Sequence, residues 1–321
     1  MALTTVTGAT VAPASVTSAA SNQHYYDTVL RTANRHLLLH EQFLDAKPIP
    51  AHTGKVLNVR TRAEFPVITS ALPEGVTPSA RTMTITENYC QVYQYGDVAG
   101  VTDLLDMTSN DPVLNEIVSE QSAQMALSRD TLIRDFIVGD IDTVYYAESG
   151  ALTPTSGTAI ALAAAHLDLM IMNFKNAKVP KVTKLIKPGT GYASQPVGAG
   201  WFLLGSPDSI SPLRADTEWS EVEYYAQPGQ AVEGEVGKYR DIRCIECTNL
   251  HNDGTDWSNI LWGPNCGVVT GLDGMSAKHY TAPFGSGDDV LHQRQKVGWK
   301  MSLGAMITKQ SNILVVKTLM T

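Results

Sequence analysis

The stretch "TSALPEGVTPSARTMTITENYCQVYQYGD", residues 69–97, decides how this chain is interpreted. Its second half alternates strictly between two kinds of position: Thr82, Thr84 and Thr86 alternate with Met83 and Ile85, and then Tyr89, Gln91, Tyr93 and Tyr95 alternate with Cys90, Val92 and Gln94. A period of two residues predicts a β-strand with two unlike faces. No neighbouring segment offers a sheet to cover this strand, so its cover must be sought elsewhere.

The strand is the returning half of an extended β excursion over residues 53–96. On the outgoing half, three residues of one face (Leu57, Val59, Thr61) alternate with three of the other (Asn58, Arg60, Arg62). The tip, 64–80, carries the turn and breaker residues Pro66, Pro73, Gly75 and Pro78. An isolated pair of strands is marginal in water. The sequence therefore predicts a two-stranded arm that is stable only on another surface.

Residues 111–138 predict a long helix. Asp111 suits the N-cap, Pro112 suits the first helical position, and Gly139 is placed for the C-terminal cap. The expected apolar stripe consists of Leu114, Ile117, Val118, Met125, Leu132, Ile133 and Phe136. At 1.5 Å per residue the helix is about 40 Å long, which suits a strut better than the body of a compact enzyme.

The rest of the chain predicts a mixture of helices and strands. A helix over 25–45 is stopped by "KPIP" at 47–50, and a second helix covers 164–177. Residues 200–205 predict a buried strand and 207–226 two short helices. Further strands are expected near 240–248, 258–262, 266–270 and 311–320.

Composition limits the classes of function. The 321 residues are 43% hydrophobic and 17% charged, as in a globular chain of one elaborate domain or two intertwined ones. A net charge of −8 disfavours nucleic-acid binding by the surface as a whole. Four cysteines are too few for a disulfide scaffold and favour a reducing compartment. We expect no signal peptide and no membrane partner, since the most apolar stretch, 158–172, is short and interrupted.

Three patterns raise the question of a metal site. His36 and His40 have the spacing of a two-histidine zinc face, but the glutamate that should follow the first histidine is absent. "CIEC" places Cys244 and Cys247 on a predicted strand, where they point to opposite faces, with His251 and Cys266 downstream. "HNDGTD", 251–256, lacks the closing glutamate of a calcium loop. We expect no metal, no cofactor and no catalytic site, with a zinc-dependent hydrolase built on the histidines as the enzyme alternative.

Two tracts of opposite charge lie far apart in the sequence. The basic tract is Lys175, Lys178, Lys181, Lys184 and Lys187, and the acidic tract is Asp216, Glu218, Glu221, Glu223, Glu233 and Glu235. Opposite tracts on one chain can pair between copies and set their register. We therefore expect these residues at contacts between subunits.

Several short motifs follow one another along the chain: "KPIP" and "TGKVLNVR" before the tip, "LPEGVTP" at 72–78, "QYGD" at 94–97, "DPVLNE" at 111–116, "DTLIRD" at 130–135, "TEW" at 217–219, "GEVG" at 234–237 and "VGWK" at 297–300. In this order, from about residue 27 to the end, they resemble the major capsid proteins of tailed phages, and more narrowly the coat-protein family of the N-four-like podoviruses.

The resemblance implies an α+β fold of the HK97 capsid type. It implies an N-terminal arm at 1–24, a helix and connector at 25–52, and an extended β-hairpin loop at 53–96. A peripheral domain would comprise 97–160 and 291–321 around the spine helix, with the closing segment 305–320 returning to it. An axial domain would comprise 161–290. The strand of the opening stretch would then lie on a neighbouring subunit.

The resemblance also implies a function: self-assembly into hexamers and pentamers of an icosahedral shell around double-stranded DNA, in a virion assembled in the host cytoplasm. The expected contacts between subunits on the extended loop are Arg60, Arg62, Leu72, Glu74, Val76, Pro78 and Arg81. Further partners would be a portal, a separate scaffolding protein, a decoration protein and packaged DNA held by weak, non-specific contact. An encapsulin-like cargo shell is the alternative within this fold. Since no lysine occurs between Lys55 and Lys175, the tip of the loop cannot supply one for a covalent cross-link.

Overall fold

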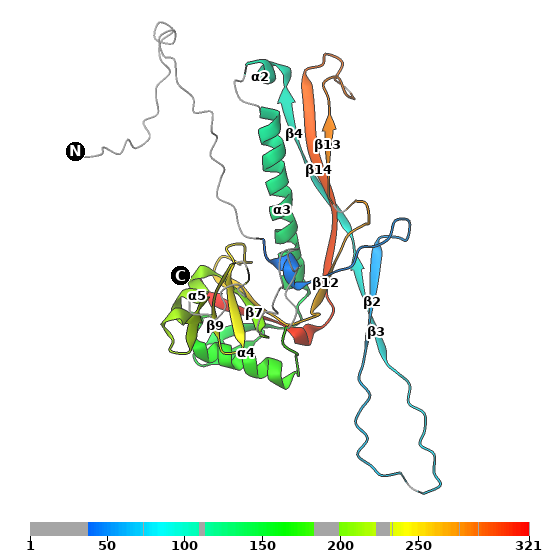
Figure 1. Cartoon of the computed structure of the whole chain (residues 1–321), viewed down its shortest axis with the longest axis vertical. Coiled ribbons are helices and arrows are strands. Elements are labelled where there is room, and N and C mark those ends of the chain that lie inside the picture. The colour runs from blue at the N-terminus through cyan, green and yellow to red at the C-terminus, as the bar shows by residue number, and fades with distance from the viewer. Residues whose placement is uncertain are drawn as a thin grey trace, which may run out of the picture. The chain divides into compact units, whose positions relative to one another are not determined.

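The computed structural model describes residues 38–72, 74–108, 113–182, 199–222, 232, 234–275, 277–287 and 289–320. Within these residues the strands form a five-stranded sheet, an eight-stranded sheet and a two-stranded hairpin (Figure 1). The expected arm at 1–24 and most of the helix predicted over 25–45 lie outside the described residues. No helix of the described part is long and apolar enough to cross a membrane.

The five-stranded sheet is organised around strand β14 (Arg294–Ile307). Strands β4 (Tyr93–Thr102), β12 (Gly267–Thr270) and β13 (Lys278–Ala282) all pair with it antiparallel, and β1 (Asp45–Ala46) runs parallel to β12. Val297, Trp299 and Met301 alternate with more exposed residues, so one face of this sheet is covered.

Helix α3 (Val113–Asp140) is the long helix that the sequence predicts, and it packs on β14. It continues through Gly139, the expected cap, and the predicted caps at 111 and 112 lie outside the described residues. Of the seven predicted stripe residues only Ile133 is fully buried. The other buried positions are Gln121, Asp130 and Ile137. The other six stripe residues are half-buried, and polar side chains share the covered side of the helix, since the Gln121 amide donates to the Val297 carbonyl at 3.0 Å.

The eight-stranded sheet holds most of the core. Its order is β6 (Ala151–Pro154), β5 (Val144–Glu148), β15 (Ile313–Leu319), β11 (Asp256–Trp262), β7 (Trp201–Gly205), β10 (Ile242–Glu246), β9 (Glu235–Tyr239) and β8 (Trp219–Glu221). The strands predicted at 200–205, 240–248, 258–262, 266–270 and 311–320 are confirmed, as is the helix at 164–177, which is α4 (Ala164–Asn176).

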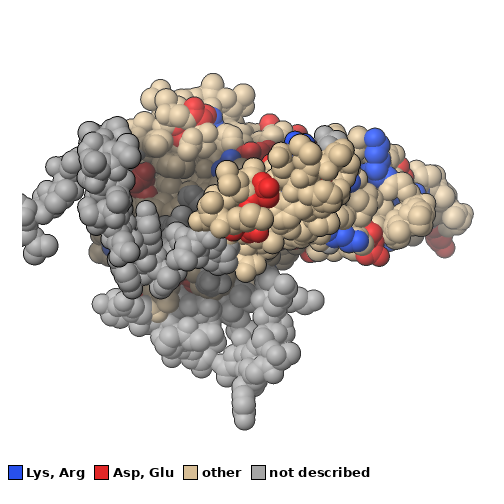
Figure 2. All heavy atoms as spheres, turned by 90° about the horizontal axis from the view of Figure 1, so that it is seen from above, with Lys and Arg blue, Asp and Glu red and all other residues tan. Residues whose placement is uncertain are grey.

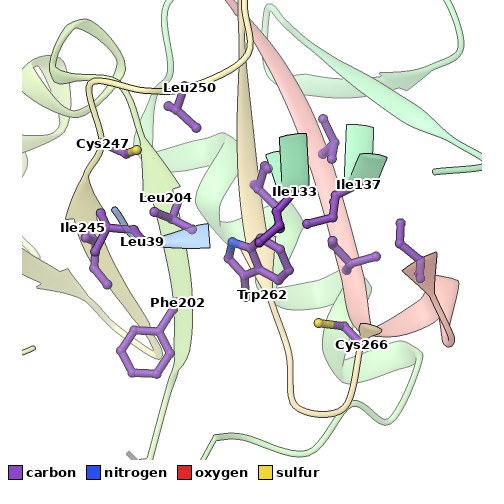
Figure 3. Close-up of a cluster of buried hydrophobic side chains, with 14 of the residues drawn as sticks. Leu39, Ile133, Ile137, Phe202, Leu204, Ile245, Cys247, Leu250, Trp262 and Cys266 are labelled. Carbon is purple, nitrogen blue, oxygen red and sulfur yellow. The ribbon is translucent and has the colours of Figure 1, made fainter. Parts of the chain in front are cut away.

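Both faces of this sheet are covered. Phe202 and Leu204 of β7 enter one cluster with Ile133 and Ile137 of α3, while Leu203 enters a second cluster that contains α4. Figure 3 shows the first cluster around Trp262. Burial on both faces explains why the central strands are continuous apolar runs.

Four local predictions are corrected by the structure. The part of the 25–45 helix that is described is only the 3₁₀ turn η1 (His40–Phe43), followed by β1. The strand predicted from the opening stretch is two strands, β3 (Ile85–Gln91) and β4, interrupted at Val92. Within 207–226, α5 (Pro207–Ile210) and the 3₁₀ turn η2 (Ser211–Ala215) are followed by a strand. The closing segment 305–320 is the end of β14, the turn η5 (Gln310–Asn312) and β15.

The closing strand β15 lies between β5 and β11 in the eight-stranded sheet. Strands from the expected peripheral ranges, 97–160 and 291–321, and from the expected axial range, 161–290, therefore share one sheet. The expected domain boundaries stay a prediction.

Candidate assembly interface

The hairpin of β2 (Val56–Arg62) and β3 is paired in register from Val56 with Gln91 to Arg62 with Ile85. Beyond this pairing the chain makes an open loop: every described residue from Arg62 through Glu87 is exposed. Only at the base does a hairpin side chain become buried, where Cys90 is 4% exposed. The hairpin thus has no covering layer within the described residues, as its sequence pattern suggested.

The loop carries a set of large apolar side chains that contact solvent. Their exposed fractions are 58% for Phe65, 87% for Val67, 68% for Ile68, 67% for Leu72 and 59% for Val76. Clusters of exposed apolar side chains on a soluble protein mark a surface that binds another macromolecule. We call this set the loop patch.

The structure places the predicted contact residues along the hairpin and its loop, and none of the contacts found between described residues joins two of them. Leu72, Glu74, Val76 and Pro78 are all exposed at the tip. Arg60 pairs within the chain, with its Nε 3.1 Å from Glu87 Oε1. Hydrogen bonds from Tyr89 and Asn58, together with Arg60, lower the pKa of Glu87.

The remaining two arginines of the predicted set differ from Arg60. Arg62 and Arg81 are exposed, and neither has an ion pair among the residues that the structure describes. They remain candidates for pairing with a neighbouring subunit.

The base of the hairpin is anchored to the body of the protein. The Val92 amide donates to the Lys55 carbonyl at 2.9 Å, which closes the hairpin just before β4 begins. A Cβ atom at Gly304 of β14 would lie 2.7 Å from the Gln91 carbonyl oxygen, so the two chains approach closely only because residue 304 is glycine.

Two of the quoted motifs meet across β4 and β14. Asp97 of "QYGD" is directly opposite Trp299 of "VGWK". Gln124 of α3 bridges them, since its Nε2 donates to Asp97 Oδ2 at 2.8 Å and its Oε1 accepts from Trp299 Nε1 at 3.1 Å. Sequence patterns did not identify Gln124, because a single glutamine on a helix carries no distinguishing signal.

His40 is part of the structural framework rather than a metal site. Its Nδ1 lies 2.9 Å from Asp130 Oδ2, its backbone amide donates to Asp130 Oδ1, and the ring is fully buried. Asn249 also donates to Asp130. Burial alone would raise the pKa of Asp130, but these bonds and the charge of His40 together lower it. His36 lies outside the described residues.

The cysteines of "CIEC" face opposite sides of the sheet, as predicted. Cys244 lies in the cluster with α4 and Cys247 in the cluster with α3, so the two thiols cannot bind one ion. Burial raises the pKa of Cys247 to about 11. No group of three metal-binding side chains occurs in the described ranges. In "HNDGTD", the Asp253 carboxylate accepts bonds from Thr255, Asp256 and Lys317, as in a tight turn.

Several described members of the two charged tracts have ion-pair partners within the chain. Lys175 and Lys181 both pair with Asp241, at 3.2 and 2.7 Å. Glu218 pairs with Arg240.

Lys184, Lys187, Glu223 and Glu233 lie outside the described residues. Figure 2 shows acidic and basic side chains interspersed on the face seen from above. Pairing of the tracts between subunits stays a prediction.

Comparison with known proteins identifies the fold. No protein-family model matches the chain, and no curated protein matches it. Solved structures of other proteins do match this chain. The capsid of the cyanophage P-SCSP1u matches with a TM-score of 0.66 at 13% identity, over 92% of both chains. The head of Helicobacter pylori bacteriophage KHP40 matches with a TM-score of 0.68 at 12% identity, over 97% of this chain and 98% of that one.

The acid-stable capsid of Helicobacter pylori bacteriophage KHP30 matches over the full length of both chains, with a TM-score of 0.62 at 11% identity. At such identities the similarity establishes the fold. The chain has the mixed α and β fold of phage capsid proteins, and the expectation of a capsid fold is confirmed at this level.

Proposed function

We propose that this chain is the major capsid protein of a tailed bacteriophage, of the HK97 type and the N-four-like podovirus family. In this proposal it is a structural protein, not an enzyme, and it assembles into the hexamers and pentamers of an icosahedral shell around double-stranded DNA. The matches to phage capsid folds, which cover 92–100% of this chain, support the class of protein. The observation that carries self-assembly is the hairpin loop, exposed at every described residue from Arg62 through Glu87.

The physical reason is the loop patch. Burying one such apolar side chain contributes about 1.5–3 kcal/mol. Within the chain this contribution is not realised, because the patch lies in solvent. A neighbouring copy that covers the loop realises it, and a contact between two different surfaces of identical subunits generates rings when the rotation closes. Many modest contacts of this kind hold a closed shell together.

Several finer features belong to the same proposal. Residues 1–24 serve as an N-terminal arm, 53–96 as the extended loop and α3 as the spine helix of a peripheral domain, with 161–290 as the axial domain. A portal, a separate scaffolding protein and a decoration protein are the expected partners. The net charge of −8 suits a container whose DNA is held only by weak contacts.

Electron microscopy of the purified chain tests the proposal. The expected result is closed shells of uniform diameter, in equilibrium with small oligomers detected by light scattering. The proposal is wrong if the chain remains a monomer at high concentration while hydrogen exchange shows the hairpin folded and protected. Shells from infected cells that contain protein cargo instead of DNA would favour the encapsulin-like alternative.

A further inference from the structure

The face of the β4–β14–β13 sheet that points away from α3 contains a trough. Three residues lie side by side across it: Val98, Gly298 and Tyr280, from the three strands in turn. Gly298 has no side chain, while Val98 and Tyr280 on either side are 64% and 52% exposed. The resulting hollow has a volume of about 580 Å³ and is lined mainly by apolar surface.

Lysines surround this trough. Lys278 lies directly opposite Lys300, and Lys296 lies on the same face of β14. Like charges placed directly opposite each other on neighbouring strands are destabilising. None of the three lysines has an ion pair with a described residue. A sheet that keeps this unfavourable arrangement has a surface suited to an apolar partner with acidic groups.

A projection that carries both apolar and acidic side chains lies at the end of the same sheet. Helix α2 (Asp103–Thr108) follows β4, and the turn at 289–292 precedes β14. The Asp103 amide donates to the Gln293 carbonyl, which holds the helix and the turn together. Five large apolar side chains are exposed on this projection: Leu104 (70%), Leu105 (46%), Met107 (84%), Val290 (85%) and Leu291 (75%). We call it the acidic knob, because Asp103 and Asp106 lie among these residues.

We propose that the acidic knob of one copy docks in the lysine-rimmed trough of a second copy. Both surfaces are apolar, and the carboxylates of Asp103 and Asp106 complement the three lysines of the rim.

The contact must form between copies. Thr102, which leads into α2, pairs with Arg294, four residues from Gly298 along β14. About 13 Å of rigid, paired strand therefore separates the knob from the trough of its own chain.

This contact adds to the one proposed for the hairpin loop, and it rests on the proposed function only in requiring self-association. It joins two different surfaces, so each copy both donates a knob and receives one. Such head-to-tail contacts generate a ring when the rotation between successive copies closes. The knob and the trough would thus determine how the five-stranded sheets of neighbouring copies are positioned in the shell.

Engineered cysteines test the contact. The four natural cysteines are all buried, so the variant Met107→Cys with Tyr280→Cys presents a new pair of exposed thiols. Oxidation of assembled particles should give dimers, trimers and higher oligomers on a non-reducing gel, and each single variant should not. A matched pair, Val76→Cys with Tyr280→Cys, asks whether the hairpin loop occupies the trough instead. Oligomers from this pair alone would overturn the proposal.

A charge exchange gives an independent measurement in the Met107→Cys, Tyr280→Cys background. Lys300→Glu should reduce the cross-linked yield about tenfold, and adding Asp106→Lys should restore it. No reduction, or no restoration, would count against the contact. Particles that form normally but fail to cross-link would overturn this inference and leave the proposed function intact. Absence of particles from the unmodified chain would instead count against the proposed function.

Discussion

Replacing Val67 and Ile68 by serine should weaken assembly without destabilising the subunit. The two side chains expose 87% and 68% of their surface, so the isolated chain gains almost nothing from them. Because complete burial of such a side chain contributes about 1.5–3 kcal/mol, covering the exposed fractions of both contributes about 2–5 kcal/mol at each contact. Each 1.4 kcal/mol is a factor of about ten in an association constant, so the threshold concentration for assembly should rise about 30-fold or more.

The assay is light scattering across a series of subunit concentrations, with electron microscopy of the same samples. Thermal unfolding of unassembled subunits serves as the stability readout and should be unchanged. Met172→Ser is the matched control, since Met172 is 56% exposed on α4, away from the loop. If the loop variant assembles at the same concentration as the unmodified chain, the reasoning that the loop is covered by a neighbour is refuted.

Four further outcomes are expected. The pKa of Asp130 is lowered in the folded state, so its contribution to stability is present above the ordinary carboxyl pKa and is lost as pH falls below about 4. Denaturant unfolding should show this loss of stability, and Asp130→Asn should remove the pH dependence. Burial raises the pKa of the thiols, to about 11 for Cys90 and about 12 for Cys266. The native chain should therefore not react with a thiol reagent at pH 8, whereas the reagent should label four thiols in the denatured chain. Rapid labelling of the native state would contradict this. The shell should dissociate to single chains in hot detergent under reducing conditions, and a persistent ladder of oligomers would disprove a non-covalent shell. Changing all five lysines of the 175–187 tract to glutamine should lower the assembly yield and flatten its salt dependence, and an unchanged yield would exclude pairing between the tracts.

The sequence is sufficient to predict the helices and strands that have a strong apolar periodicity. The hairpin, the long helix and the buried strands each carry a pattern that local physics dictates, and each is present. The sequence-based prediction nevertheless missed β14, the strand at the centre of the five-stranded sheet. Its apolar residues Val297, Trp299, Met301 and Leu303 alternate correctly, but Gly298 and Gly304 weaken the strand signal. Glycine is present there because neighbouring backbone approaches closely, and only the folded structure shows that approach.

The candidate site was predictable in part. The exposed hairpin follows from a strand pattern for which the sequence offers no covering sheet. The residues predicted as subunit contacts at its tip are exposed, and their contacts stay a prediction. The division of the opening stretch at Val92 was not predictable, because the same alternation continues from β3 into β4 while the pairing partner changes from β2 to β14. The polar bonds of Gln121, Gln124 and Asp130 to partners distant in sequence were equally hidden.

The position of β15 has a consequence for biosynthesis. Strand β15 pairs with β5, about 170 residues earlier in the chain, and β14 pairs with β4 across a similar separation. The five-stranded sheet cannot be completed on the ribosome until β14 has been translated, and the eight-stranded sheet must wait for β15. Pairings so distant in sequence also form slowly. A nascent chain therefore exposes its apolar hairpin before either large sheet is complete. In the proposed assembly, the surface that receives a neighbour's hairpin would form only when translation is nearly finished, so contacts between copies would be delayed until then.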